Sequence, residues 1–482
     1  MFLPNIGNYG GLSGKEWENS KGISKFGKMI FRILPLLLLT FAFSAEVRYD
    51  CEGFVARGLS RDPILAESRY TTEAKKNKLD EIRSAAILSK FEVSMMVGPA
   101  PGLKESVDDW GDSVDTWDFT KMGPFFATQI KAVQPLNYGQ YKVGKKAAEA
   151  DLRQQTMLVV GKEHEKNVEL QTYYYNYLLA LEMNRLVTEA KKQMDRAEEK
   201  LEEALDDDSP NVSQTDLLRL KAGRHTLDEA EIDARSGLER VRLALKFSLG
   251  LDSSEVFVPM DTVLSERTEY FPTLDEAKAV AVERHPDLKR LGAGLEARKY
   301  QLELAEAKLG PQFFLMGEFT YVKSWAGDRT AIQKNAFAQD AVNKISGAFG
   351  FGVRYNLNVW NSWSSYVSAR TELRHLKLKE NYAADGILLQ LEEQYIQTKG
   401  AKEKLESLRA SLRASESILK GAAMKYDLDP SDAGALVSAY TDNLQLQKSY
   451  YYAVCKYNIA FAELISRMGI SLSEYHQLYP GK

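Results

Sequence analysis

Histidine, cysteine and closely spaced carboxylates are the side chains in this sequence that could hold a metal ion or move a proton. The histidines are His164, His225, His285, His375 and His476, and none has cysteine or carboxylate partners at metal-ligand spacing. The glycine-rich segment 347–352 lacks the Lys-Ser/Thr pair of a phosphate-binding loop, and no nucleophile elbow is present. The sequence therefore predicts no enzyme, no cofactor and no metal site.

Two clusters of aspartates remain as candidates for holding cations. One cluster consists of Asp206, Asp207 and Asp208, and the other of Asp427, Asp429 and Asp432. If several copies surround a pore, each pore-facing carboxylate becomes a ring, and such rings attract counter-cations. The alternative is that these residues only cap helices, since Asp432 follows Pro430 where a carboxylate suits the helix dipole.

An internal repeat organises the elements that must position these clusters. An offset of 223 residues pairs Leu65 with Leu288, and a later offset of 219 pairs Gly250 with Gly469. Each half is expected to run helix, strand, strand, very long helix, second long helix, with long helices at 142–205, 212–249, 364–426 and 431–468. The longer ones would reach about 95 Å at about 1.5 Å per residue. The predicted divisions are a first repeat at 46–250, a connector at 251–273, a second repeat at 274–470 and a tail at 471–482.

Helices this long need packed partners along their whole length. Small residues with Leu and Val at three- and four-residue spacing predict coiled-coil-like seams. The charged segment 191–200 is expected to be a solvated face with ion pairs four residues apart on the same helix.

The strands show a different period. Apolar side chains alternate with small or polar ones along Phe349, Phe351, Val353 and Tyr355, and similar alternation occurs at 91–97 and 312–322. Strands of about ten residues with apolar outward faces are typical of outer-membrane barrels, so these four side chains are expected to face lipid. Segments 98–124 and 323–344 are expected to be long polar loops, and the alternative is a soluble hairpin packed on the helices. Four strands are too few to close, so closure would need several chains.

The N-terminus predicts export. Lys25, Lys28 and Arg32 precede an apolar run at 33–43, which is the layout of a secretory signal peptide within residues 1–45. The run is about half of the roughly 20 residues that a membrane anchor needs.

The net charge of −4 leaves no basic patch for nucleic acid. Cys51 and Cys455 are too few for a disulfide framework.

Several motifs occur together in the order of one known family. They are His285-Pro286-Asp287-Leu288 leading to Gly310-Pro311, Asn211-Val212-Ser213 with Asp216-Leu217-Leu218, and Gln134-Pro135-Leu136-Asn137. The chain resembles the TolC-type outer-membrane efflux proteins over roughly residues 63–470.

This resemblance implies a fold class that is mainly α with a membrane β-barrel. Three chains would form a homotrimer, with a shared twelve-stranded barrel in outer-membrane lipid and a helical tunnel through the periplasm of a Gram-negative bacterium. The tunnel's tip would dock on a periplasmic adaptor, the membrane fusion protein, and an inner-membrane transporter. The adaptor contacts implied are Ser213, Asp216, Leu217, Leu218, Ser431 and Leu436. The family's gate aspartates align with Ala435 and Ser438, which carry no charge.

The function implied is a passive exit duct of an efflux or type I secretion system, and the sequence leaves these two open. The alternative is a structural or adhesive coiled-coil envelope protein without a transport role. That class would explain the long helices but not the alternating strands.

Overall fold

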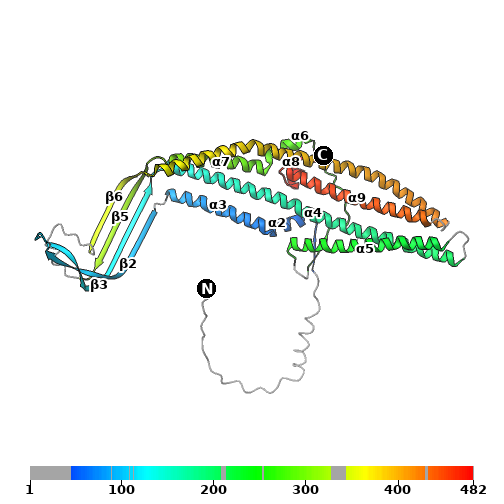
Figure 1. Cartoon of the computed structure of the whole chain (residues 1–482), viewed down its shortest axis with the longest axis horizontal. Helices are drawn as coiled ribbons and strands as arrows, with labels where there is room; N and C mark the ends of the chain where they lie inside the picture. Colours follow the sequence, from blue (N-terminus) through cyan, green and yellow to red (C-terminus); the bar gives the residue numbers. More distant parts are fainter. Residues whose placement is uncertain are drawn as a thin grey trace, which may run out of the picture.

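A computed structural model describes residues 45–87, 90–107, 109–111, 113–207, 213–251, 255–326, 343–355, 357–428 and 433–480. The expected signal peptide lies outside the described residues except for Ala45, and so do Asp208, Asp429, Ser431 and Asp432. The described part is elongated, with a sheet at one end and long helices filling the rest (Figure 1).

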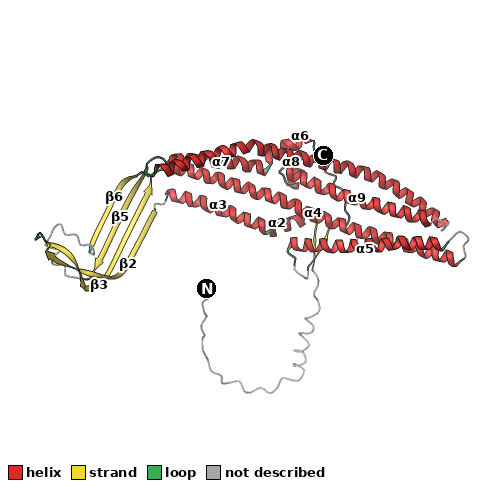
Figure 2. Ribbon diagram, in the orientation of Figure 1, coloured by secondary structure: helices red, strands yellow, loops and turns green. Residues whose placement is uncertain are grey.

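The elements of the two halves follow one another in a similar order. The first half contains β1 (Ala45–Tyr49), α2 (Cys51–Arg61), α3 (Pro63–Ile87), β2 (Lys90–Val107), β3 (Ser113–Pro135), α4 (Tyr138–Asp206), α5 (Gln214–Leu249) and β4 (Glu255–Pro259). The second half contains α6 (Leu274–Arg284), α7 (Pro286–Ala307), β5 (Gln312–Ser324), β6 (Lys344–Arg354), α8 (Val359–Leu428), α9 (Ala433–Arg467) and α10 (Leu472–Leu478). Figure 2 shows that the strands β2, β3, β5 and β6 form a body separate from the helices.

Two helices run through almost the whole helical part. α4 has 69 residues and α8 has 70. Each is therefore about 100 Å long. Both begin a few residues before their expected starts, and α8 begins after Asn358, whose side chain accepts a hydrogen bond from the Asn361 N–H at 3.4 Å. The shorter α5 ends at Gly250, whose φ of 58° closes the helix in the left-handed conformation that glycine adopts without strain.

Charged side chains in segment 191–200 of α4 pair with residues of α5. Lys191 lies 2.7 Å from both Asp228 and Glu231 of α5, and Asp195 lies 2.6 Å from Arg224. The expectation of pairs within one helix was therefore wrong for these residues. The two helices are antiparallel neighbours, and positions that flank an apolar seam face each other across it.

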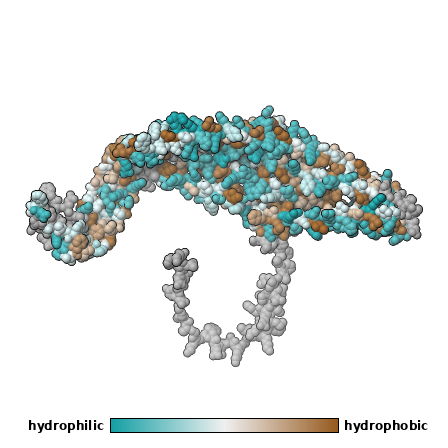
Figure 3. Space-filling view, viewed as in Figure 1, coloured by the Kyte–Doolittle hydropathy of each residue, from teal (hydrophilic) through white to brown (hydrophobic). Residues whose placement is uncertain are grey.

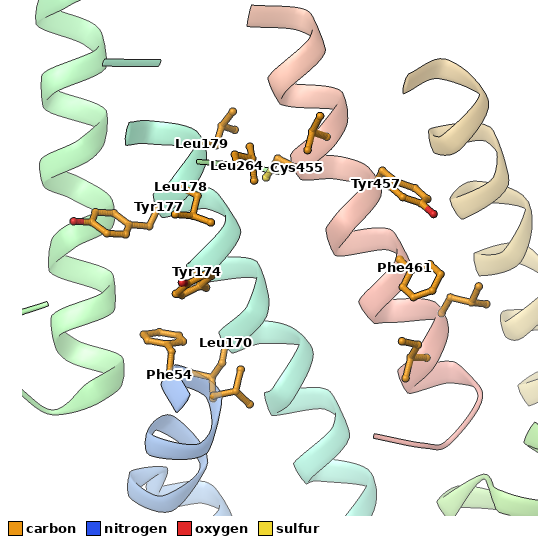
Figure 4. Close-up of a cluster of buried hydrophobic side chains, with 14 of the residues drawn as sticks. Phe54, Leu170, Tyr174, Tyr177, Leu178, Leu179, Leu264, Cys455, Tyr457 and Phe461 are labelled. Carbon is orange, nitrogen blue, oxygen red and sulfur yellow. The ribbon is translucent and has the colours of Figure 1, made fainter. Parts of the chain in front are cut away.

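A core of aromatic and aliphatic side chains lies halfway along the helices, in a region that we call the collar (α2, β1, β4, α6, α10 and residues 260–273). Figure 4 shows Phe54 and Tyr174 of this core facing each other, with Leu264 between α4 and α9. β1 pairs in parallel with β4. The expectation of an irregular connector at 251–273 thus missed β4, whose short Val-Phe-Val stretch buries Phe257 in this core.

Both cysteines are free thiols. No helix among the described residues is long and apolar enough to cross a membrane.

Candidate functional site

The sheet at one end of the molecule has two open edges. Its strands are antiparallel in the order β2-β3-β5-β6. β3 and β5, which come from different halves of the chain, pair in the middle, for example Ile130 with Phe319. The edge strands β2 and β6 have no further strand partner among the described residues, so each presents a row of unpaired backbone N–H and C=O groups.

The register gathers most of the apolar residues of the four strands on one face, while Met96, Phe314 and Met316 lie on the other. Val93 lies opposite Ile130, Ile130 opposite Phe319, and Leu315 opposite Phe351. Because side chains alternate with a period of two, this register fixes the whole face. The face also includes the polar residues Gln134, opposite Leu315, and Lys323, opposite Phe126. Its other members are Phe91, Val93, Met95, Val97, Phe126, Thr128, Ile130, Ala132, Phe313, Leu315, Gly317, Phe319, Tyr321, Ile345, Gly347, Phe349, Phe351 and Val353.

This apolar face is exposed to solvent in the single chain. Phe349 is 79% exposed, and every other aromatic or branched side chain of β6 on this face is also exposed. In the space-filling view much of the sheet is white to brown, whereas the helical part is largely teal (Figure 3). A continuous exposed apolar surface of this kind marks a site of contact with a membrane or a partner.

The opposite face carries charged side chains. Glu92 lies opposite Lys131, and Lys131 lies opposite Glu318, so a row of alternating charge crosses three strands. The Gln129 side-chain amide also donates to Glu318 Oε1 at 2.6 Å. The sheet is therefore amphipathic, with one polar and one apolar side.

The predicted lipid-facing residues lie on this sheet and just beyond it. Phe349, Phe351 and Val353 share the apolar face of β6, while Tyr355 is exposed immediately after the strand ends at Arg354. The expected alternation thus holds as far as Val353.

The first long loop was wrongly placed. Most of segment 98–124 is strand, because β2 continues to Val107 and β3 begins at Ser113. The prediction relied on the polarity of this segment and on its many Gly, Asp and Trp residues, yet most of them lie in paired strands. The pairing shifts between Pro101 and Gly102, and proline is tolerated on an edge strand. Of the second loop, residues 327–342 lie outside the described residues.

The other candidate region lies at the far end of the helices, where the α4–α5 and α8–α9 pairs both end (Figure 1). We call this region the tip and define it by one apolar cluster: Met194, Ala197, Leu201, Leu217, Leu220, Leu227, Tyr426 and Leu436. The Tyr426 hydroxyl donates to the Ala197 carbonyl at 2.7 Å, and Lys200 Nζ lies 2.9 Å from Asp427. Burial, with Asp427 nearby, raises the pKa of Tyr426 to about 12, so its hydroxyl stays protonated as a donor.

The tip separates the predicted adaptor contacts into exposed and buried residues. Ser213 is exposed at the start of α5, where its backbone N–H donates to Asp216 at 3.2 Å in a capping box. Leu218 is 61% exposed. Leu217 and Leu436 are only 6% and 3% exposed, so they pack inside the tip in this conformation.

Of the predicted acidic clusters, the structure describes Asp206, Asp207 and Asp427, all exposed near the tip. Asp427 pairs with Lys200, a contact that sequence reasoning missed because the two residues lie 227 positions apart. The structure thus shows one predicted acidic side chain in an ion pair.

Comparison with known proteins agrees with this geometry. Residues 279–428 match the family model described as "Outer membrane efflux protein". The resemblance inferred from the sequence is confirmed. The matched segment runs from α6 to the end of α8 and includes β5 and β6. No curated protein sequence matches the chain.

Solved structures share the fold at low sequence identity. The CmeC outer membrane channel of Campylobacter jejuni is 13% identical, with 89% of each chain covered and a TM-score of 0.66. The open-state MtrE outer membrane channel of Neisseria gonorrhoeae is 14% identical over 87% of this chain and 88% of that one, with a TM-score of 0.67. The outer membrane protein VceC of Vibrio cholerae is 14% identical over 87% and 96%, with a TM-score of 0.63. The chain therefore shares the fold of these outer-membrane proteins.

Proposed function

We propose that the chain is one subunit of a passive exit duct in the outer membrane of a Gram-negative bacterium, with a large periplasmic part. The observation that carries this proposal is the amphipathic four-stranded sheet with two open edges, placed at one end of helices about 100 Å long. The duct serves a tripartite efflux or type I secretion system. Energy comes from its partners, and the chain itself is not an enzyme.

Closure of the sheet requires more copies of the chain. An open sheet edge is not tolerated in lipid, and the smallest membrane barrels have eight strands. In the proposed homotrimer, β6 of each copy pairs with β2 of the next, which gives twelve strands. β5 with 13 residues and β6 with 11 are long enough to span the hydrocarbon region, for which about 9 to 11 residues suffice. The apolar face then contacts lipid, and the row of Glu92, Lys131 and Glu318 faces the water-filled lumen.

The helices support the same assembly. On α8, the exposed side chains Tyr382, Leu389 and Ile396 recur every seven residues, which is coiled-coil spacing without a partner in the described part of this chain. We assign this stripe to contact with a neighbouring copy. The two structural repeats, residues 46–250 and 274–470 joined by the connector 251–273, then place like elements around the tunnel, and residues 471–482 form the tail.

The tip is the proposed contact with a periplasmic adaptor, the membrane fusion protein, which links the duct to an inner-membrane transporter. Ser213, Asp216 and Leu218 on α5, with Ser431 at the other turn, are its proposed contact residues. The aspartates near both turns make the narrow end acidic and favourable to cations. CmeC and MtrE are described as outer membrane channels, which supports the placement of the duct in the outer membrane.

An adhesive or structural coiled-coil protein is the weaker proposal, because such a protein has no use for an apolar sheet face. The deciding experiment is extraction of the full-length protein from membranes with detergent, followed by native mass spectrometry and planar-bilayer recording. We expect a trimer that conducts ions. A stable monomer, or a protein released from membranes without detergent, would rule out the duct.

A further inference from the structure

Two histidines that the proposed duct does not use lie where the collar meets the long helices, His285 buried and His164 partly buried. His285 separates α6 from α7 and is 6% exposed. His164 lies on α4, and its Nδ1 is buried without a hydrogen-bond partner among the described residues. A buried polar atom without a partner lowers stability, so the His164 Nδ1 atom calls for an explanation.

His285 holds two helices together at a tight junction. As the N-cap of α7, its Nδ1 accepts a hydrogen bond from the Asp287 N–H at 3.1 Å. The turn between α9 and α10 lies directly against its backbone, and a Cβ added at Gly469 would collide with the His285 Cα. Gly469 also has a φ of 77°, so glycine is required here on both counts. Any movement of the α6–α7 junction must displace this turn.

His164 borders a small cavity of mixed polar and apolar lining beside the same turn. The cavity measures about 10 Å³, enough for one water molecule. Its polar lining includes Asn167 and Gln171 of α4 together with Ser466 and Ser471 on either side of the turn. His164 and His285 therefore both lie beside the α9–α10 turn.

We propose that His164 and His285 form a proton-sensitive contact between α4, the α6–α7 junction and the α9–α10 turn, which we call the joint. These elements stay packed together when both rings are neutral, and they separate more readily when the rings are protonated. The joint is a property of the single chain, so it stands independently of the duct proposal. Protonation of His285 at Nδ1 removes the acceptor for the Asp287 N–H and uncaps α7. Protonation of His164 places a charge in a cavity that has room for only one water molecule.

The surrounding charges decide the direction of the effect. Carboxylates lie near the rings on α4 (Glu163), α10 (Glu474) and α7 (Asp287), and cations lie near His285 on α9 (Arg467) and α7 (Arg290). A charged His164 also disfavours protonation of His285, and Arg284 of α6 lies near Glu474. Burial is the largest influence and lowers the pKa of both histidines. When the joint opens, both histidines are exposed to water and regain the ordinary pKa of about 6.5. The closed joint therefore binds fewer protons than the opened joint, and it loses stability as the pH falls below about 6.5.

Amide hydrogen exchange of the full-length protein in detergent tests the joint. Peptides that cover residues 285–290 and 469–475 should exchange faster at pH 5.0 than at pH 7.5, after correction for intrinsic rates. The upper limit is about thirtyfold per histidine if the folded joint excludes the proton altogether. The His164→Gln, His285→Asn double variant should abolish the acid effect, since asparagine caps helices without titrating. His375→Gln, at an exposed position on α8, should leave it unchanged.

A second measurement needs no variant. Exchange of the histidine ring C2 proton, followed by mass spectrometry in the wild-type protein, gives a titration midpoint for each histidine. His164 and His285 should each titrate below about 6.5, the ordinary pKa of histidine. Midpoints at or above that value, or acid sensitivity that persists in the double variant, would overturn the joint. Neither readout depends on channel activity, so failure of the duct proposal would be seen separately.

Discussion

Adjacent positions on β6 offer a direct test of which face of the sheet meets lipid. Phe349 and Ala348 are neighbours in sequence and point to opposite faces. Phe349 lies opposite Gly317, which has no side chain, and is itself 79% exposed. Ala348 lies opposite Glu318 on the polar face. Arginine placed at one position therefore enters lipid, and at the other it enters the proposed lumen beside a carboxylate.

The expected magnitudes differ clearly. Phe349→Arg loses at most about 0.5 kcal/mol of packing within the chain, a fifth of the roughly 2.5 kcal/mol that full burial of a Phe contributes. If the face meets lipid, the arginine costs about 2 to 4 kcal/mol per chain near the bilayer midplane, and about 6 to 12 kcal/mol over three copies. Ala348→Arg should raise the free energy of unfolding by about 0.2 to 1 kcal/mol through a cross-strand pair with Glu318.

The assay is insertion into the outer membrane, measured as the protease-resistant fraction, together with guanidinium titration of the protein refolded in lipid vesicles. We expect Phe349→Arg to insert poorly and Ala348→Arg to insert like the wild type. Equal behaviour of the two variants would refute the lipid assignment. A shift of only about 0.5 kcal/mol for Phe349→Arg would favour a water-soluble sheet.

Three further predictions concern the tip. Tyr426→Phe should lower the free energy of unfolding by about 1 kcal/mol in denaturant titration, because the Ala197 carbonyl loses its buried donor; an unchanged midpoint would mean that the bond contributes nothing. A cysteine at Ser213 should crosslink to a periplasmic adaptor, whereas one at Ser365, close to the sheet, should not; labelling of Ser213→Cys from outside intact cells would reverse the proposed orientation. Neutralising Asp206 and Asp207 to Asn should reduce cation selectivity in single-channel recordings at low salt, where charges act over longer distances; unchanged selectivity would show that these residues do not line the constriction.

Local patterns in the sequence predicted the strand that carries Phe349 because side-chain alternation is a property of one strand alone. The extent of the first hairpin was missed for a different reason. The Gly, Asp and Trp residues of segment 98–124 are typical of loops, yet most of them lie in paired strands here, and the register shift after Pro101 absorbs the irregularity. Which strands are edges depends on pairing between the two halves of the chain, and no local pattern records that.

The tip shows the same division between local and distant information. The capping box of Ser213 and Asp216 could be read from their spacing, and it does begin α5. The burial of Leu217 and Leu436 could not, because it depends on how two helical hairpins from different halves pack together. A leucine next to a turn looks the same in sequence whether it contacts a partner or the other hairpin.

Charge at the tip has to be counted in pairs that only the fold reveals. The segment ending at Lys200 looked like a solvated surface, but Lys200 reaches across to α8, where its ammonium bonds both the Asp427 carboxylate and the Asp427 carbonyl. Asp427 is 72% exposed, so this pair stabilises the tip by little, yet it offsets the carboxylate's charge at close range. Among the described residues no ion pair offsets Asp206 or Asp207. In a trimer, each unpaired carboxylate is repeated three times. Asp206 and Asp207 at the end of α4 would then contribute more negative charge than Asp427 at the end of α8, so the acidic character of the proposed mouth depends chiefly on the first half of the chain.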